Sequence, residues 1–159
     1  MLNCQTLTRC GFGAFTCCCD RFPVWRNSSN ESAVKGVKVP GASIFLVEDE
    51  GLIRLMLADM VEELGHRVVA EAGNLEVGQA LAETAIFDLA ILDINIAGRI
   101  ISPVAKIIAR RDLPFLFVSG YGPAGRPEQF SDRPVLQKPV LISNLGEAID
   151  SMLSSAAGA

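Results

Sequence analysis

The stretch FDLAILDIN, residues 87–95, holds an apolar run that ends at polar residues. The run 87–92 predicts a buried strand, the third and central one of five such runs along the chain. Asp93 follows this strand directly, and Asn95 stands two residues further on. Taken alone, Asp93 also fits a polar strand end that begins a loop. Its role therefore depends on which residues the neighbouring strands bring to the same edge.

Strand-like apolar runs alternate with amphipathic helical runs from Ala42 onward. The strand-like runs are 43–48, 66–73, 87–92, Phe115–Ser119 and Val135–Gln137, and the helical runs are 51–65, Leu75–Thr84, 102–111 and about 141–153. This alternation predicts parallel strands joined by right-handed helical crossovers. Glycines and prolines between Tyr121 and Pro134 make any further helix there short and weakly held. We therefore expect an α/β domain with five strands and about five helices.

The helical run 51–65 has two distinct faces. Ile53, Leu57 and Val61 are among the apolar residues that recur at helical spacing, which predicts one face packed on the core. Arg54 and Asp59 fall on the other side. We expect that side to face water.

Composition limits the classes of function that this chain can have. Its 159 residues, 50% hydrophobic and 20% charged, suit one compact domain with a core. The net charge is −4 and the basic residues are scattered, which disfavours direct nucleic-acid binding. No apolar run approaches the roughly 20 residues needed to cross a bilayer. We therefore expect no membrane insertion and a cytoplasmic protein.

All five cysteines lie within the first 19 residues, before the periodic part of the chain begins. Their spacing lacks the paired arrangement in which two thiolates hold one zinc ion. The stretch that follows, 27–40, is small and polar and has no helical or strand period. We therefore expect residues 1–41 to form a Cys-rich, disordered N-terminal extension and linker, and residues 42–157 to form the folded domain.

The predicted strands end in polar residues that should meet at one edge. Glu48 and Asp49 come at the end of the first strand, Asp93 and Asn95 follow the third, Ser119 ends the fourth, and Lys138 follows the fifth, ahead of Pro139. In open parallel sheets the ligand binds outside the carboxyl ends of the strands. Three clustered carboxylates repel one another unless a cation intervenes, and hard oxygen ligands in a half-open site suit Mg2+. The sequence thus predicts a magnesium site.

A carboxylate beside a bound metal can act as a nucleophile toward phosphorus. A hydroxyl and an ammonium group nearby can hold the oxygens of the transferring phosphoryl group. Because it lies on the central strand, Asp93 is the natural acceptor, with Ser119 and Lys138 beside it.

Four motifs together, LVEDE, LAILDIN, FVSGY and QKP, resemble the receiver domain of two-component response regulators over about residues 42–153. The resemblance implies a flavodoxin-like, doubly wound parallel sheet of strand order 2-1-3-4-5. It implies that Asp93 accepts a phosphoryl group from a sensor histidine kinase or a histidine phosphotransfer protein. It also assigns Glu48, Asp49, Asp93 and the carbonyl of Asn95 to Mg2+, and Ser119 and Lys138 to the phosphoryl oxygens.

The residues 117–121, FVSGY, are similar to a subgroup of single-domain receivers marked by a Phe-Ala-Thr-Gly-Tyr stretch, with Val118 and Ser119 as departures. Many receivers carry an aromatic switch residue three positions before the lysine, where this chain has Val135. Tyr121 is the best remaining switch candidate. The loop after Asp93 also lacks the Met-Pro and Asp-Gly pattern of many receivers.

We therefore expect a phosphoprotein of a phosphorelay, and not an enzyme, beyond its own phosphotransfer and autodephosphorylation. Because the chain stops one helix after Lys138, we expect no effector domain. Its output would be a downstream protein partner that binds a surface around the fourth helix and fifth strand, or the draining of phosphate.

Two other classes of function compete with this expectation. A phosphatase or phosphotransferase that forms an aspartyl phosphate should carry a second acid two residues after the nucleophile. Asn95 occupies that position and cannot transfer a proton. A pseudo-receiver that only binds partners is disfavoured because the acceptor, acidic pair, hydroxyl and lysine are all present.

Overall fold

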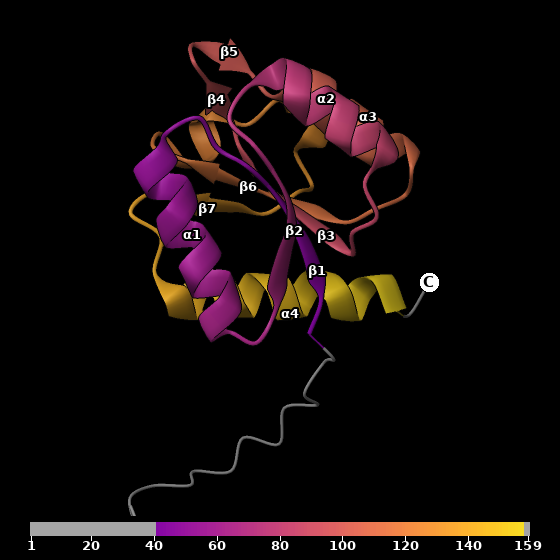
Figure 1. Ribbon diagram of the computed structural model, residues 1–159. Coiled ribbons are helices and arrows are strands. Elements are labelled where there is room, and N and C mark those ends of the chain that lie inside the picture. Colours follow the sequence, from indigo (N-terminus) through magenta and orange to yellow (C-terminus); the bar gives the residue numbers. More distant parts are fainter. Residues whose placement is uncertain (1–40, 158–159) are drawn as a thin grey trace, which may run out of the picture. The chain divides into compact units, whose positions relative to one another are not determined.

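The computed structural model describes residues 41–157 (Figure 1). The cysteines and all but the last residue of the extension expected over residues 1–41 lie outside the described residues. The described part folds as an α/β domain whose elements follow the chain in the predicted alternation. None of its helices is both long enough and apolar enough to span a membrane.

Five parallel strands form the central sheet, in the order β2-β1-β3-β6-β7. Their bounds are Ser43–Val47 for β1, Arg67–Ala72 for β2, Leu89–Asp93 for β3, Phe115–Ser119 for β6 and Val135–Gln137 for β7. Numbered along the sheet-forming strands alone, this is the order 2-1-3-4-5, so the flavodoxin-like topology is confirmed. Strand β3 lies at the centre, and all five of its residues are buried.

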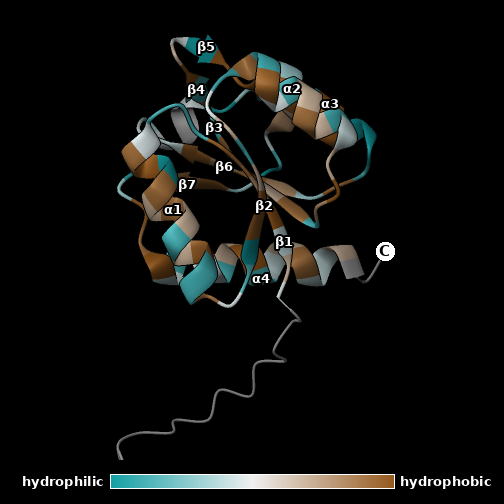
Figure 2. Ribbon diagram, in the orientation of Figure 1, coloured by the Kyte–Doolittle hydropathy of each residue, from teal (hydrophilic) through white to brown (hydrophobic). Residues whose placement is uncertain are grey.

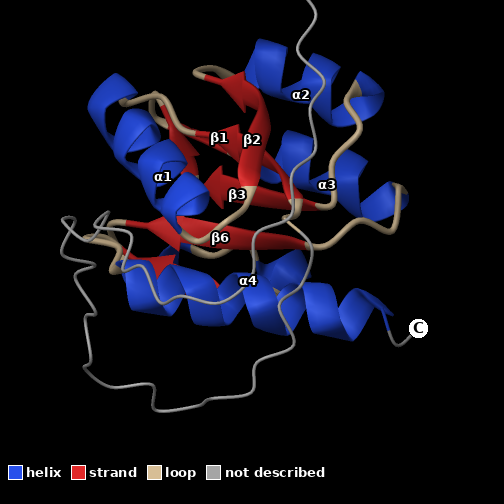
Figure 3. Cartoon of the chain, turned by 60° about the horizontal axis from the view of Figure 1, so that its bottom comes forward, coloured by secondary structure: helices blue, strands red, loops and turns tan. Residues whose placement is uncertain are grey.

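Four α-helices cover the two faces of the sheet (Figure 3). Their bounds are Gly51–Glu63 for α1, Leu75–Thr84 for α2, Ser102–Arg110 for α3 and Ile142–Ala157 for α4. Residues of α1 and α4 share one hydrophobic cluster, and residues of α2 and α3 share the other. Each observed boundary lies within a few residues of its predicted position, as expected for helix and strand ends.

The strands are apolar on both sides because each side faces a layer of helices. In β1, Ile44 and Leu46 belong to the cluster under α1 and α4, whereas Phe45 and Val47 belong to the cluster under α2 and α3. Figure 2 shows the strands mostly in the brown of hydrophobic residues, between helices of mixed colour. A sheet covered on both faces needs such continuous apolar runs.

Two short 3-10 turns, η1 (Gly122–Gly125) and η2 (Glu128–Phe130), stand where a fourth helix was expected. Gly122 has a φ of +60°, and Pro127 precedes η2. Both residues interrupt a continuous α-helix. The segment is still anchored, because the buried Phe130 ring lies 5.3 Å from the Phe115 ring, centroid to centroid.

A small hairpin after β3 was not predicted. Strands β4 (Asn95–Ile96) and β5 (Arg99–Ile100) pair antiparallel around the turn residues Ala97 and Gly98. Both turn residues have positive φ, 49° and 80°, as a two-residue type I′ turn requires. The hairpin was missed because Ala-Gly is a weak signal for this turn and each strand has only two residues.

Candidate functional site

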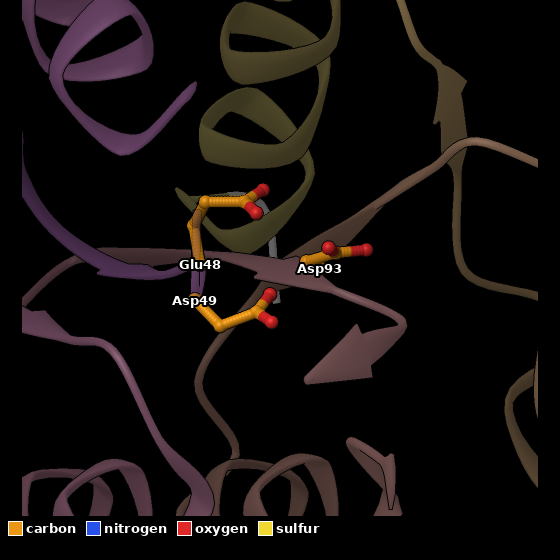
Figure 4. A group of neighbouring side chains, drawn as sticks. All are labelled: Glu48, Asp49 and Asp93. Atoms are coloured by element: carbon orange, nitrogen blue, oxygen red, sulfur yellow. The ribbon is translucent and has the colours of Figure 1, made fainter. Parts of the chain in front are cut away.

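The polar strand ends meet at one edge of the sheet, between the central strands. Glu48 follows β1, Asp93 ends β3 and Lys138 follows β7. Carboxylate oxygens of Glu48, Asp49 and Asp93 lie within 4.8 Å of one another, and Figure 4 shows these three side chains gathered at the edge. This edge is the topological switch point, where the chain leaves β1 toward β2 on one side and β3 on the other.

Lys138 brings a positive charge among these acids. Its Nζ donates hydrogen bonds to Glu48 Oε2 at 2.7 Å and to Asp93 Oδ2 at 2.9 Å. The lysine side chain is only 16% exposed. The expectation that this lysine faces the acids, and not solvent, therefore agrees with the geometry.

Glu48 and Lys138 have perturbed acidities. Burial raises the pKa of the Glu48 carboxyl, the bond from Lys138 opposes that rise, and the charge of Asp93 adds to it. Burial pushes the pKa of Lys138 down, but its bonds to Glu48 and Asp93 outweigh burial and leave that pKa raised. The ammonium form of Lys138 is thus held in place by the two acids.

The unpredicted hairpin forms one wall of the site. The backbone N–H of Ala97 donates to Asp49 Oδ2 at 2.9 Å, and the N–H of Asn95 donates to Asp93 Oδ1 at 3.3 Å. Arg99 also pairs with Glu76 at the start of α2, 2.6 Å apart. The loop after Asp93 therefore contacts two of the three acids and a covering helix.

Ser119 ends β6 and is buried. Its Oγ accepts a hydrogen bond from the N–H of Tyr121 at 3.1 Å, and its carbonyl accepts one from the N–H of Lys138 at 2.9 Å. A Cβ on Gly125 of η1 would lie 3.4 Å from this Oγ. The Tyr121 side chain is 79% exposed. The serine hydroxyl is thus joined to the segment that leads into η1.

Arg54 is a part of the site that sequence reasoning missed. Its Nη1 donates to the carbonyl oxygen of Glu48 at 2.7 Å, and its Nε pairs with Glu71 Oε2 at 3.2 Å. The expectation that Arg54 faces water therefore holds only in part, because its side chain is 27% exposed and also bonds two protein oxygens. Helical spacing shows the direction in which a side chain leaves the helix, but a long arginine can still reach back over the preceding turn.

The donor set fits a magnesium ion. It consists of carboxylate oxygens, the hard ligands that Mg2+ prefers, and Asp49 is partly exposed, so that bound waters can be kept. Lys138 supplies one positive charge against three acids. The cluster can therefore take up further positive charge.

These features define an open α/β domain of the flavodoxin-like class with an acidic site at the carboxyl edge of its sheet. No family model matches the chain. The solution structure of SdrG from Sphingomonas melonis Fr1 is 37% identical, with a TM-score of 0.65, over 72% of this chain and 98% of that one. The solution structure of the BeF3-activated conformation of SdrG from Pseudomonas melonis Fr1 is 39% identical over 70% of this chain and 95% of that one, with a TM-score of 0.61.

Two further proteins are similar. The response regulator PhyR from Brucella abortus is 27% identical over 74% of this chain and 50% of that one, with a TM-score of 0.64. The transcriptional regulatory protein PdtaR of Mycobacterium tuberculosis is 33% identical over 115 residues, 70% of this chain. The chain spans 56% of the length of that curated relative. The chain belongs to the receiver domain family of response regulators, the signalling proteins of two-component systems.

Proposed function

We propose that Asp93 accepts a phosphoryl group from a phosphohistidine of a sensor histidine kinase or a histidine phosphotransfer protein. The observation that carries the proposal is the ammonium group of Lys138, held between Asp93 and Glu48 at the carboxyl edge of the sheet. A partly buried lysine paired with the acceptor supplies the charge that a transferred phosphoryl group needs. Ser119, on the neighbouring strand, supplies a hydroxyl.

In this reaction a carboxylate oxygen of Asp93 attacks the phosphorus atom. A P–O bond forms, the P–N bond to the imidazole breaks, and the imidazole nitrogen leaves with the bonding electron pair. Later attack by water on the acyl phosphate releases inorganic phosphate and restores the carboxylate. Asn95 and Lys138 hold the two oxygens of Asp93 at 3.3 and 2.9 Å, which fixes the plane of the carboxylate.

The carboxylates of Glu48, Asp49 and Asp93, with the carbonyl of Asn95, would hold the magnesium ion. When bound, Mg2+ neutralises charge on these acids and on the phosphoryl oxygens. Lys138 then exchanges its bond to Glu48 for one to a phosphoryl oxygen, and the Ser119 hydroxyl donates to another. Both groups are within one residue of the ends of β6 and β7.

The output would be a change of the surface formed by η1, η2 and β7. Ser119 is the link, because its hydroxyl is bonded to Tyr121 and lies against Gly125 of η1. A phosphoryl oxygen that draws the hydroxyl inward would move the exposed Tyr121 ring and the turns behind it. The BeF3-activated conformation of SdrG supports this proposal, because BeF3 imitates a phosphoryl group in shape and charge. A cytoplasmic downstream protein would bind the changed surface, or the domain would drain phosphate.

Intact mass measured after treatment with acetyl phosphate and Mg2+ tests the acceptor. We expect one added phosphoryl mass in the wild type, and none in Asp93→Asn or after chelation of the metal. Asp88→Asn is the matched control, because the exposed Asp88 lies just before the other end of β3 and bonds the N–H of Ser43 at 2.7 Å. A phosphoryl group that persists in Asp93→Asn would refute the assignment.

The kinase would dock beside the acids. Leu52 and Leu55 on α1 and Leu141 before α4 are exposed apolar side chains, 85%, 60% and 59% exposed, and they follow the strand ends that carry Asp49 and Lys138. Exposed apolar groups close to a reactive edge suit a protein partner.

We predict that Leu55→Lys slows phosphotransfer from the cognate kinase at least about tenfold. In the complex with the kinase, the variant would bury a desolvated charge where Leu55 makes an apolar contact. Labelling by acetyl phosphate should be unchanged, since this small donor needs no docking surface. Ile86→Lys is the control, because Ile86 is an even more exposed apolar residue, 89% against 60% for Leu55, but precedes β3 at the opposite end of the sheet. Equal transfer rates for Leu55→Lys and Ile86→Lys would rule out this docking site.

A further inference from the structure

Arg54 joins three elements at the point where the acidic pair begins. It lies in the second turn of α1, its Nη1 donates to the carbonyl oxygen of Glu48 at 2.7 Å, and its Nε pairs with Glu71 of β2 at 3.2 Å. The guanidinium thus ties the helix to the end of β1 and to the neighbouring strand. Its two contacts use separate nitrogens of one rigid, planar group.

The bonded carbonyl belongs to the peptide unit between the two acids. The N–H of Glu48 still pairs with the carbonyl of Ala72 across the sheet at 3.0 Å. The carbonyl oxygen of Glu48 accepts its hydrogen bond from Arg54 and not from a neighbouring strand. A hydrogen bond from a charged donor is about twice as strong as a neutral one. Arg54 therefore fixes the orientation of the peptide from which the side chains of Glu48 and Asp49 diverge.

Gly73 shows independently that the fold makes room for this contact. A Cβ at Gly73 would lie 3.0 Å from Arg54 Nη1 and 3.9 Å from the Glu48 carbonyl oxygen. The backbone at Gly73 is not in the positive-φ region, so its conformation does not require glycine. The absence of a side chain at this position instead leaves space for the guanidinium.

We propose that Arg54 is a positioning residue for the magnesium site, acting through the Glu48–Asp49 peptide. Gly73, which has no side chain, leaves the space that the guanidinium occupies. This inference rests on the proposed function. Without the arginine the peptide can turn, and the two carboxylates no longer share one preferred arrangement. Loss of such an outer partner typically weakens metal binding by about 10-fold to 100-fold. The phosphoryl-binding groups, Ser119 and Lys138, have no contact with Arg54 among the hydrogen bonds of the described residues.

The test is a Mg2+ titration of full-length wild type, Arg54→Met, Arg54→Lys and Gly73→Ala. Binding is followed by the amide NMR signals of Asp49, Asp93 and Ala97, which report metal without any phosphorylation. We expect the dissociation constant for Mg2+ to rise about tenfold in Arg54→Met and in the same direction, by less, in Gly73→Ala. Arg54→Lys should recover part of the loss, because an ammonium can still reach the Glu48 carbonyl.

Phosphorylation by acetyl phosphate supplies a second readout. The half-saturating Mg2+ concentration should rise with the dissociation constant, while the rate at saturating Mg2+ stays within about twofold, because Asp93, Ser119 and Lys138 are intact. A general loss of structure would instead also lower the rate at saturating Mg2+. Arg67→Met is the matched control, since Arg67 bonds Ser43 Oγ at 3.1 Å across the same strand pair, at its far end.

The possible outcomes separate this inference from the proposed function. If wild type binds no Mg2+ and gains no phosphoryl group, both fail. If wild type does both, and Arg54→Met or Gly73→Ala binds Mg2+ as tightly as Arg67→Met, the role of Arg54 is refuted and the proposed function stands. Should Arg54→Met fail to fold, Gly73→Ala and Arg54→Lys decide by the same titration.

Discussion

Lys138 pairs with two buried carboxylates, Glu48 and Asp93, which would otherwise repel each other. Glu48 has no exposed surface, and Asp93 has 6%. Each gives one carboxylate oxygen to the same ammonium, 2.7 and 2.9 Å away. In the metal-free protein, Lys138 therefore acts as the counter-ion of the site. In the proposed function, the same group turns to a phosphoryl group once another cation neutralises the acids.

Replacing Lys138 by methionine should therefore destabilise the metal-free protein by about 1–3 kcal/mol, the usual cost of leaving a buried polar group without its partner. The loss should shrink as pH falls through the raised pKa of Glu48, because a protonated carboxyl needs no counter-charge. Mg2+ should restore more stability to this variant than to wild type.

Urea unfolding at several pH values, with and without Mg2+, measures these effects. Lys106→Met, at an exposed position on α3, is the control. If Lys138→Met were as stable as Lys106→Met at neutral pH without metal, Lys138 would not be the counter-ion described here.

At the scale of elements, the segment η1–η2 is the part best suited to change. Its 3-10 turns are short, and its connection to the site runs through the hydrogen bond from Tyr121 to Ser119. Phe130 anchors the far end in the core. A segment fixed at one end and joined to the proposed phosphoryl site at the other can respond without unfolding the domain.

Hydrogen exchange across residues 120–134 should therefore change when BeF3 and Mg2+ are added, with the largest change at the amide of Tyr121, whose bond to Ser119 Oγ is the link. The amides of β2, on the far edge of the sheet, should not change. Asp93→Asn treated in the same way is the control and should show no difference. Identical protection of residues 120–134 in both states would exclude this segment as the switch.

At the scale of the whole molecule, the sheet and the four strand ends could be predicted from sequence for one physical reason. Buried strands are apolar along their length, so a carboxylate or lysine directly after such a run, as at Asp93 or Lys138, marks the edge where a parallel sheet binds its ligands. Strand order then brings together residues that are as many as 90 positions apart, as Glu48 and Lys138 are.

The features that could not be predicted depend on contacts that leave no periodic pattern. The hairpin depends on Ala97, an alanine with positive φ, whose N–H is bonded by Asp49. The role of Arg54 depends on a side chain that reaches back along its own helix to the Glu48 carbonyl. Both are contacts of single side chains with backbone atoms, which only the folded structure brings together.

The central claim is that Asp93 carries the phosphoryl group, and reduction by borohydride tests it most directly. Borohydride converts an aspartyl phosphate to homoserine, a stable change that peptide mass spectrometry can locate. After phosphorylation with Mg2+ present, homoserine should appear at position 93, and it should be absent when the metal is chelated. Homoserine at another acid such as Asp49, or none at all, would contradict the account.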